Sequence, residues 1–201
     1  MDLDNSGGCL CQYATVWWRM IERLSTKDWI DAGLRLMAGH GAGAVRVERL
    51  AEILSVTKGS FYWHFQDRGA LLKALIEAWK NRATSDIIDQ VEAQGGDADA
   101  RLRTLFITVM QMDGRLDHAI RAWAAEDPAA REALAEVDKC RLGYLESLFL
   151  GIGFSPAEAI ARARLVYHAL IGQFTMGTFA NYRERLDECH NIILPMLVRK
   201  T

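Results

Sequence analysis

Apolar residues recur every three or four positions along most of this sequence, and this period constrains the fold more than any other feature. Trp29, Ile30, Gly33, Leu36 and Met37, for example, fall on one face of a single helix. The sequence contains neither a sustained alternation with period two nor a glycine-rich nucleotide loop. It therefore predicts an all-α fold.

Composition and charge exclude several classes of protein. The chain has 201 residues, 50% of them hydrophobic, which is enough to bury a substantial core and excludes global disorder. A formal net charge of -2 gives no overall basic field, so any nucleic-acid function must depend on a local surface. No apolar run approaches the ~20 residues of a membrane span, and the four cysteines form no CxxC pair. We therefore expect a cytoplasmic protein with no membrane segment.

The first part of the chain reads as a small domain of short helices. Its predicted helices cover 27–39 and 46–54, a third helix after Thr57, and a fourth from Asp67 to about Val91. Thr26, Thr57 and Asp67 are the predicted N-caps, because their side-chain oxygens can accept from the first free amides of a helix. The tight connections predict a compact three-helix head at 26–79, from which the fourth helix leads into a domain at 80–201.

The second part of the chain reads as five longer helices. They are predicted at 98–113, 115–125, 128–151, 156–179 and 182–199, and the small polar stretch 93–100 is the clearest break in composition. Asp127 before Pro128 marks one helix start, and the Ser155 to Glu158 stretch, with Pro156, is a complete capping box.

The stretch "SVTKGSFYWHF", from Ser55 to Phe65, gathers donors and aromatic rings on a short helix behind a tight turn. Phe61 and Phe65 are spaced to face inward, so the other side chains of this helix face out. This arrangement is that of a helix-turn-helix, in which the second helix enters the major groove of DNA. The sequence thus predicts a DNA-binding head.

Residues 26–79 resemble the DNA-binding head of the tetracycline-repressor (TetR) family. The segment "RLAEILSVTKGSFYWHFQDRGALLKAL" is similar to the family's second to fourth helices almost position by position. The resemblance implies base contacts from Lys58 to Ser60 and phosphate contacts from Tyr62, His64 and Arg68. The complete set of implied DNA-binding positions is Arg46, Thr57, Lys58, Gly59, Ser60, Tyr62, Trp63, His64 and Arg68.

The same resemblance implies that the C-terminal domain binds a small-molecule effector and dimerises through its last two helices. Two apolar stripes, one from Ile160 to Phe174 and one from Leu186 to Leu197, suit such an interface. The implied function is that of a ligand-released repressor that binds a palindromic operator as a homodimer and needs no cofactor or metal. The predicted pocket residues are Phe106, Met110, Arg121, Trp123, Tyr144, Tyr167, His168 and Phe174.

Other interpretations remain open at this point. A helical ligand-binding or protein-interaction module with little specific DNA binding would share the same helices, and the head carries only one more basic than acidic residue. A helical-bundle enzyme is the other class, but no Glu-x-x-His pair is present to hold a metal. In the extension 1–25, residues 14–24 have the spacing of an amphipathic helix that docks on the body, a partner or DNA; alternatively, Met20 is the true start.

Overall fold

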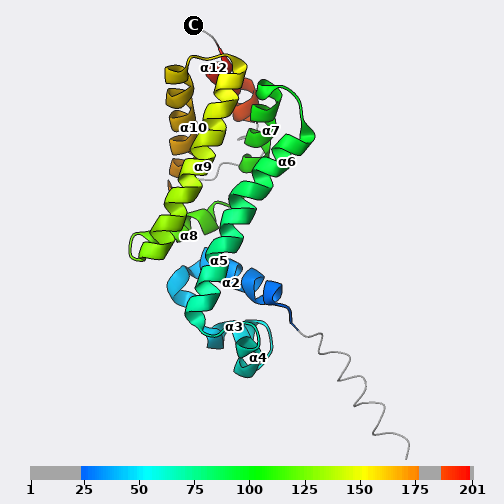
Figure 1. Cartoon of the computed structure of the whole chain (residues 1–201), viewed down its shortest axis with the longest axis vertical. Coiled ribbons are helices and arrows are strands. Elements are labelled where there is room, and N and C mark those ends of the chain that lie inside the picture. The colour runs from blue at the N-terminus through cyan, green and yellow to red at the C-terminus, as the bar shows by residue number, and fades with distance from the viewer. Residues whose placement is uncertain (1–23, 177–186, 200–201) are drawn as a thin grey trace, which may run out of the picture.

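The computed structural model of the chain describes residues 24–176 and 187–199, and all regular secondary structure in these two ranges is helical. Figure 1 shows that α3 and α4 lie at one end of the molecule, whereas α12 lies at the other end. Within the described ranges, the predicted all-α fold is confirmed. Residues 14–23 of the predicted amphipathic helix 14–24 lie outside the described residues.

The first two helices of the head begin and end within one residue of the predicted positions, and the third and fourth begin directly after Thr57 and Asp67, as predicted. They are α2 (Thr26–His40), α3 (Val47–Ile53), α4 (Lys58–Tyr62) and α5 (Arg68–Lys80). The predicted cap at Thr26 is wrong: the N-cap of α2 is Ser25, which forms a capping box with Asp28, and Thr26 is the first helical residue. These hydrogen bonds from Ser25 hold the pKa of Asp28 below its ordinary value. The other cap that the structure supports is Asp67, whose carboxylate accepts from the Ala70 amide at 2.8 Å.

The core of the head continues into the rest of the protein. Trp29, Leu50 and Phe61 are fully buried in the head, and the same cluster includes Ile120 and Val137 from the second part of the chain. Helix α2 packs against α8 (Arg115–Ala124), which brings these residues together. The head is therefore joined to the body by shared packing as well as by the chain.

A single long helical path connects the head to the body. The predicted fourth helix is observed as α5, a π-helical turn (Asn81–Ser85) and α6 (Asp86–Gln94), which follow one another without a break (Figure 1). Two ion pairs fix this path at its centre: Arg82 with Asp31 of α2, and Lys80 with Glu136, each at 2.6 Å. The path is thus anchored to both the head and the body near the π-helical turn.

In the described ranges, each of the five segments predicted for the second part of the chain contains helix, while 177–179 and 182–186 lie outside the described residues. The observed helices are α7 (Ala98–Met110), α8, α9 (Pro128–Ile152), α10 (Pro156–Met176) and a final π-helical turn (Cys189–Ile193) followed by α12 (Leu194–Val198). The predicted caps are confirmed at Asp127, which accepts from the Ala130 amide, and at Ser155 with Glu158. The composition break at 93–100 proves to be the turn between α6 and α7, inside the body, where Gly95 and Gly96 have positive φ.

Candidate functional site

The short helix α4 is held in place by the aromatic residues on its inner face. Phe61 is fully buried and its ring lies 5.4 Å from the rings of both Trp29 and Phe65, measured between centroids. The turn before α4 includes Ser55, whose φ of 55° is in the left-handed region, and the Val56 amide donates to the Ala51 carbonyl at 2.9 Å. The predicted helix-turn-helix geometry, with Phe61 and Phe65 turned inward, is therefore present.

All nine predicted DNA-binding residues are exposed or half-exposed in the structure. Two aromatic side chains extend furthest into solvent: Tyr62 is 62% exposed and Trp63 is 89% exposed. Since α3 and α4 form one end of the molecule (Figure 1), these side chains are accessible to a large partner. The complete set is Arg46, Thr57, Lys58, Gly59, Ser60, Tyr62, Trp63, His64 and Arg68.

Two of these side chains, His64 and Lys58, also contact other side chains within the head. His64 Nδ1 lies 3.1 Å from the Thr26 hydroxyl, which places both groups beside the first turn of α2. Lys58 forms an ion pair with Glu48 of α3 at 2.8 Å, and its hydrogen bond holds the pKa of Glu48 below its ordinary value. These pairs orient the exposed groups, and they add Thr26 and Glu48, which the sequence analysis missed.

Arg68 and Thr57 differ in detail from the sequence-based expectation. The Arg68 guanidinium donates to the carbonyls of Val45 and Ala42, at 2.6 and 2.8 Å, and so ties the start of α5 to the α2–α3 connection. The phosphate contact of Arg68 stays a prediction, and this contact must use guanidinium N–H groups that do not bond to the two carbonyls. Thr57 occupies the N-cap position of α4, but its side chain makes no capping hydrogen bond. The predicted hydroxyl cap is therefore wrong, although its position is right.

The body contains a largely apolar, partly open cavity of about 430 Å³, lined by residues of α5–α6, α7, α8, α9, α10 and α12. Five of the eight predicted pocket residues line it: Phe106, Met110, Tyr144, Tyr167 and Phe174. Trp79, at the end of α5, and Thr84, in the π-helical turn, also line it, so the helical path from the head forms part of the cavity wall.

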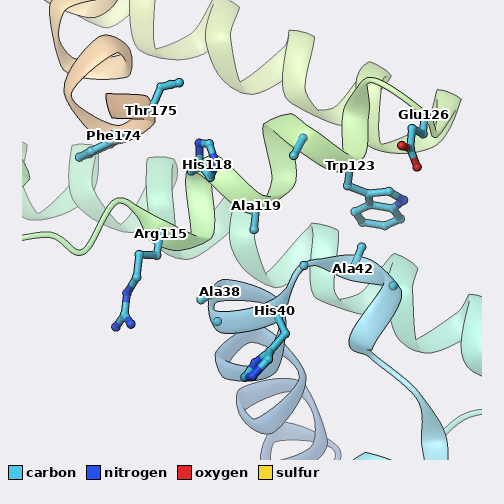
Figure 2. A pocket seen from close by; sticks show the side chains of 14 residues that line it. Ala38, His40, Ala42, Arg115, His118, Ala119, Trp123, Glu126, Phe174 and Thr175 are labelled. Carbon is cyan, nitrogen blue, oxygen red and sulfur yellow. The ribbon is translucent and has the colours of Figure 1, made fainter. Parts of the chain in front are cut away.

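The other three predicted pocket residues do not line this cavity. Trp123 lines a second, more open pocket of about 530 Å³ where α2 and the loop after it meet α8 (Figure 2). Phe174 lies between the two pockets and contributes to both. His168 is exposed on α10 and lines neither pocket, because its face of α10 is turned away from the body core. Arg121 is engaged in ion pairs instead.

Arg121 belongs to a buried network of charges beside the cavity. It pairs with Asp117 at 2.8 Å and with Asp138 at 2.7 Å, and Tyr167 donates to Asp138 at 2.6 Å. Burial raises the pKa of Tyr167 to about 12, and the hydrogen bond to Asp138 acts in the same direction. Arg141 completes the network by pairing with Asp117 at 2.8 Å. The two arginines and the two aspartates of this network therefore carry no net charge together.

The sequence analysis found Arg121 but missed its partners. Asp117 and Arg121 are four residues apart, and Asp138 and Arg141 are three apart, so each helix carries a recognisable acid–base pair. The spacing alone does not reveal that the two pairs meet across α8 and α9.

Neither a metal-binding cluster nor a membrane-spanning helix is found in the described residues. In residues 24–176 and 187–199, no group of three or more His, Cys, Asp or Glu side chains is arranged to hold a metal ion. None of the helices in these ranges combines the length and apolarity required to cross a membrane.

Comparisons with known proteins agree with this geometry. Residues 30–75 match the family model "Bacterial regulatory proteins, tetR family". The chain is 28% identical over 163 residues to the tetracycline repressor protein class G of Vibrio anguillarum, covering 79% of this chain and 71% of that one.

Solved structures share the fold. A TetR-family transcriptional regulator from Rhodococcus sp. has a TM-score of 0.67 at 20% identity, over 89% of this chain and 100% of that one. AibR, in complex with isovaleryl coenzyme A and operator DNA, has a TM-score of 0.66 at 15% identity, over 88% and 98% of the two chains. The matched segment 30–75 contains all of α3 and α4, together with most of α2 and α5, so the head of this chain is a domain of the tetR family of bacterial regulatory proteins.

Proposed function

We propose that this protein is a transcription regulator that binds a palindromic DNA operator as a homodimer and releases it when a small molecule occupies the body cavity. The observation that carries the proposal is the recognition helix α4, which presents an almost fully exposed Trp63 from a helix anchored by the fully buried Phe61. A repressor of this kind acts in the cytoplasm and needs no catalytic step.

The outer face of α4 is built for an external partner. An indole that is 89% exposed has little packing within the head, whereas against DNA it can contact a thymine methyl group or the sugar–phosphate backbone. At Gly59 an added methyl group would meet only the Thr57 hydroxyl, at an ordinary 3.6 Å. Packing within the chain therefore does not require glycine there, while close approach of the backbone to DNA would.

The helical path α5–α6 provides the connection between the two sites. Its first residue, Arg68, is bonded to the α2–α3 connection in the head, and Trp79 and Thr84 line the cavity in the body. A molecule that changes the position of this path changes the separation of the two recognition helices in the dimer. These must lie about 34 to 36 Å apart, or a multiple of that, to enter successive major grooves.

The proposed dimer uses α10 and the last helix, as the sequence analysis expects. Ala163, Tyr167 and Phe174 of the first predicted stripe are buried within the chain, so they belong to its own core. Met176, 69% exposed at the end of α10, and Ile192, 60% exposed in the π-helical turn before α12, do not line the body cavity and leave apolar surface for a second copy. In AibR, operator DNA and an acyl coenzyme A are bound to the same fold, which supports coupling between two such sites.

The test is fluorescence anisotropy with labelled DNA fragments from the region around the protein's own coding sequence, at two salt concentrations. We expect selective binding to one fragment, a linear fall of log K with log salt, and a loss of about tenfold or more in affinity in Trp63→Ala. The matched control is Ile107→Ala, which truncates an apolar side chain that is 42% exposed on α7, far from the head. Equal loss in both variants, or no selective fragment for a folded dimer, would contradict the proposal.

A further inference from the structure

In the part of the chain that the structure describes, the lining of the body cavity carries little positive charge. Among the lining residues in 24–176 and 187–199, the charged ones are Asp113, Asp117, Glu188 and one basic residue, Arg141. A ligand carboxylate or phosphate that enters this space therefore has one cation to bind and three acidic groups to avoid. Because an unpaired charge in an apolar site is costly, Arg141 decides whether an anion can bind.

Each of the three guanidinium nitrogens of Arg141 already donates a hydrogen bond within the protein. Its guanidinium pairs with Asp117 at 2.8 Å, and donates to the Ala83 carbonyl at 3.0 Å and to the Thr84 hydroxyl at 3.2 Å. It also lies over the ring of Trp79, 5.7 Å from the centroid, and its side chain is only 14% exposed. An anionic ligand that binds Arg141 competes with Asp117 for the guanidinium and weakens a largely buried ion pair, which leaves Asp117 with Arg121 as its remaining partner.

The second arginine nearby offers no alternative. Arg121 does not line the cavity, and its guanidinium is held by Asp117 and Asp138 at 2.8 and 2.7 Å. Two arginines and two aspartates thus neutralise one another before any ligand binds. Adding a further negative charge would break a balanced buried network, which is strongly unfavourable.

The remaining wall of the cavity suits an uncharged molecule. Most of its lining is aliphatic, aromatic or methionine side chains, and the volume of about 430 Å³ is near the lower end of the range for small-molecule sites. Gln173 lines the cavity with its amide and supplies a neutral donor and acceptor. The apolar lining includes Ile87, Ile88, Leu105, Val109, Met110 and Leu170.

We infer that the effector is an uncharged, mainly apolar molecule with at most a few neutral polar groups, and that the Asp117–Arg141 pair excludes anions of the same shape. This inference rests on the proposed role of the cavity as the effector site, and it adds the chemical class of the ligand. Polyanionic ligands are disfavoured by the same charges.

The experiment compares two probes of nearly equal shape, 2-acetylnaphthalene and 2-naphthoate, which differ in a methyl group against a charged oxygen. Binding to the full-length protein is measured by equilibrium dialysis at pH 7.5. We expect the ketone to bind the wild-type protein at least about tenfold more tightly than the carboxylate. Equal or tighter binding of the carboxylate, or no binding of the ketone up to its solubility limit, overturns the inference.

A charge substitution tests the role of the ion pair directly. In Asp117→Asn, Arg141 loses its carboxylate partner, so a ligand carboxylate can replace it, and we expect 2-naphthoate to gain at least about tenfold in affinity while the ketone changes little. Asp113→Asn is the matched control, because Asp113 also lines the cavity but pairs with Arg115 instead. An equal gain in the control shows a general charge effect and overturns the specific role of Asp117.

Two further measurements separate the possible failures. If Asp117→Asn does not fold, as judged by circular dichroism, the comparison of the two probes on the wild-type protein still decides the inference. DNA binding of the wild-type protein, measured by anisotropy without any probe, reports on the proposed function independently. Selective DNA binding without preference for the ketone rejects the ligand class alone, whereas loss of both rejects the proposed function.

Discussion

Gly114, the N-cap of α8, lies directly against the ring of Phe174. A Cβ atom at position 114 would lie 2.8 Å from Phe174 Cε1 and closer still to Cδ1 and Cγ. The backbone at Gly114 has φ of -71° and ψ of -4°, which any residue can adopt, so only the ring opposes a side chain there. Phe174 is 8% exposed, and the atoms nearest to the added Cβ include its Cγ, which moves only if the whole side chain moves.

We therefore predict that Gly114→Ala destabilises the protein by about 3 kcal/mol. Forcing an extra methyl group into packed surroundings costs about 1–3 kcal/mol. The loss of glycine at an N-cap adds about 0.5–1 kcal/mol, since alanine is a poor residue at that position. For a chain of this size, each kcal/mol lowers the melting temperature by about 2–4 °C, so the expected decrease is about 6–12 °C.

The measurement is thermal unfolding followed by circular dichroism at one fixed protein concentration. Gly143→Ala is the matched control: Gly143 lies inside α9, an added Cβ has nothing within 4 Å, and alanine there should stabilise by about 0.5–1 kcal/mol. Phe174→Leu in the Gly114→Ala background should recover about 1 kcal/mol or more by making room. The reasoning is refuted if Gly114→Ala has the same melting temperature as the wild type or a higher one. It is also refuted if adding Phe174→Leu to Gly114→Ala lowers the melting temperature further.

Two other predictions concern the head. Ser55→Gly should stabilise the protein by about 0.5–1 kcal/mol, because Ser55 holds a left-handed φ of 55° that costs a non-glycine residue about 1–2 kcal/mol; a lower melting temperature would contradict this. Asp31→Asn should lower the stability of the protein at pH 7, and this loss of stability should become smaller as the pH falls below about 4. The hydrogen bond from Lys27 and the ion pair with Arg82 lower the pKa of Asp31 in the folded protein, so its contribution is present above the unfolded-state pKa and lost in acid. Melting curves at several pH values test this, and a pH-independent difference would count against it.

Much of the fold was predictable because its signals are local. Helical spacing gave the positions of the observed helices, and caps such as Asp67, Asp127 and Ser155 act on amides only three residues away. The inward pair Phe61 and Phe65 follows from its spacing of four residues, and this in turn predicts which side of α4 is exposed. For this reason the recognition helix could be recognised from the sequence and its outer face could be assigned to DNA.

The cavity and its charge network depended on tertiary structure. Periodicity shows that His168 and Tyr167 lie on a helix, but only the packing of α10 decides that Tyr167 is buried and His168 exposed. Arg141 meets Asp117, 24 residues away, and Ala83, 58 residues away, so no local pattern predicts its partners. The sequence alone thus determined the helices and the exposed face of α4, because those signals span a few residues. Only the folded chain decided which charges are paired beside the cavity, because the partners are brought together by helix packing.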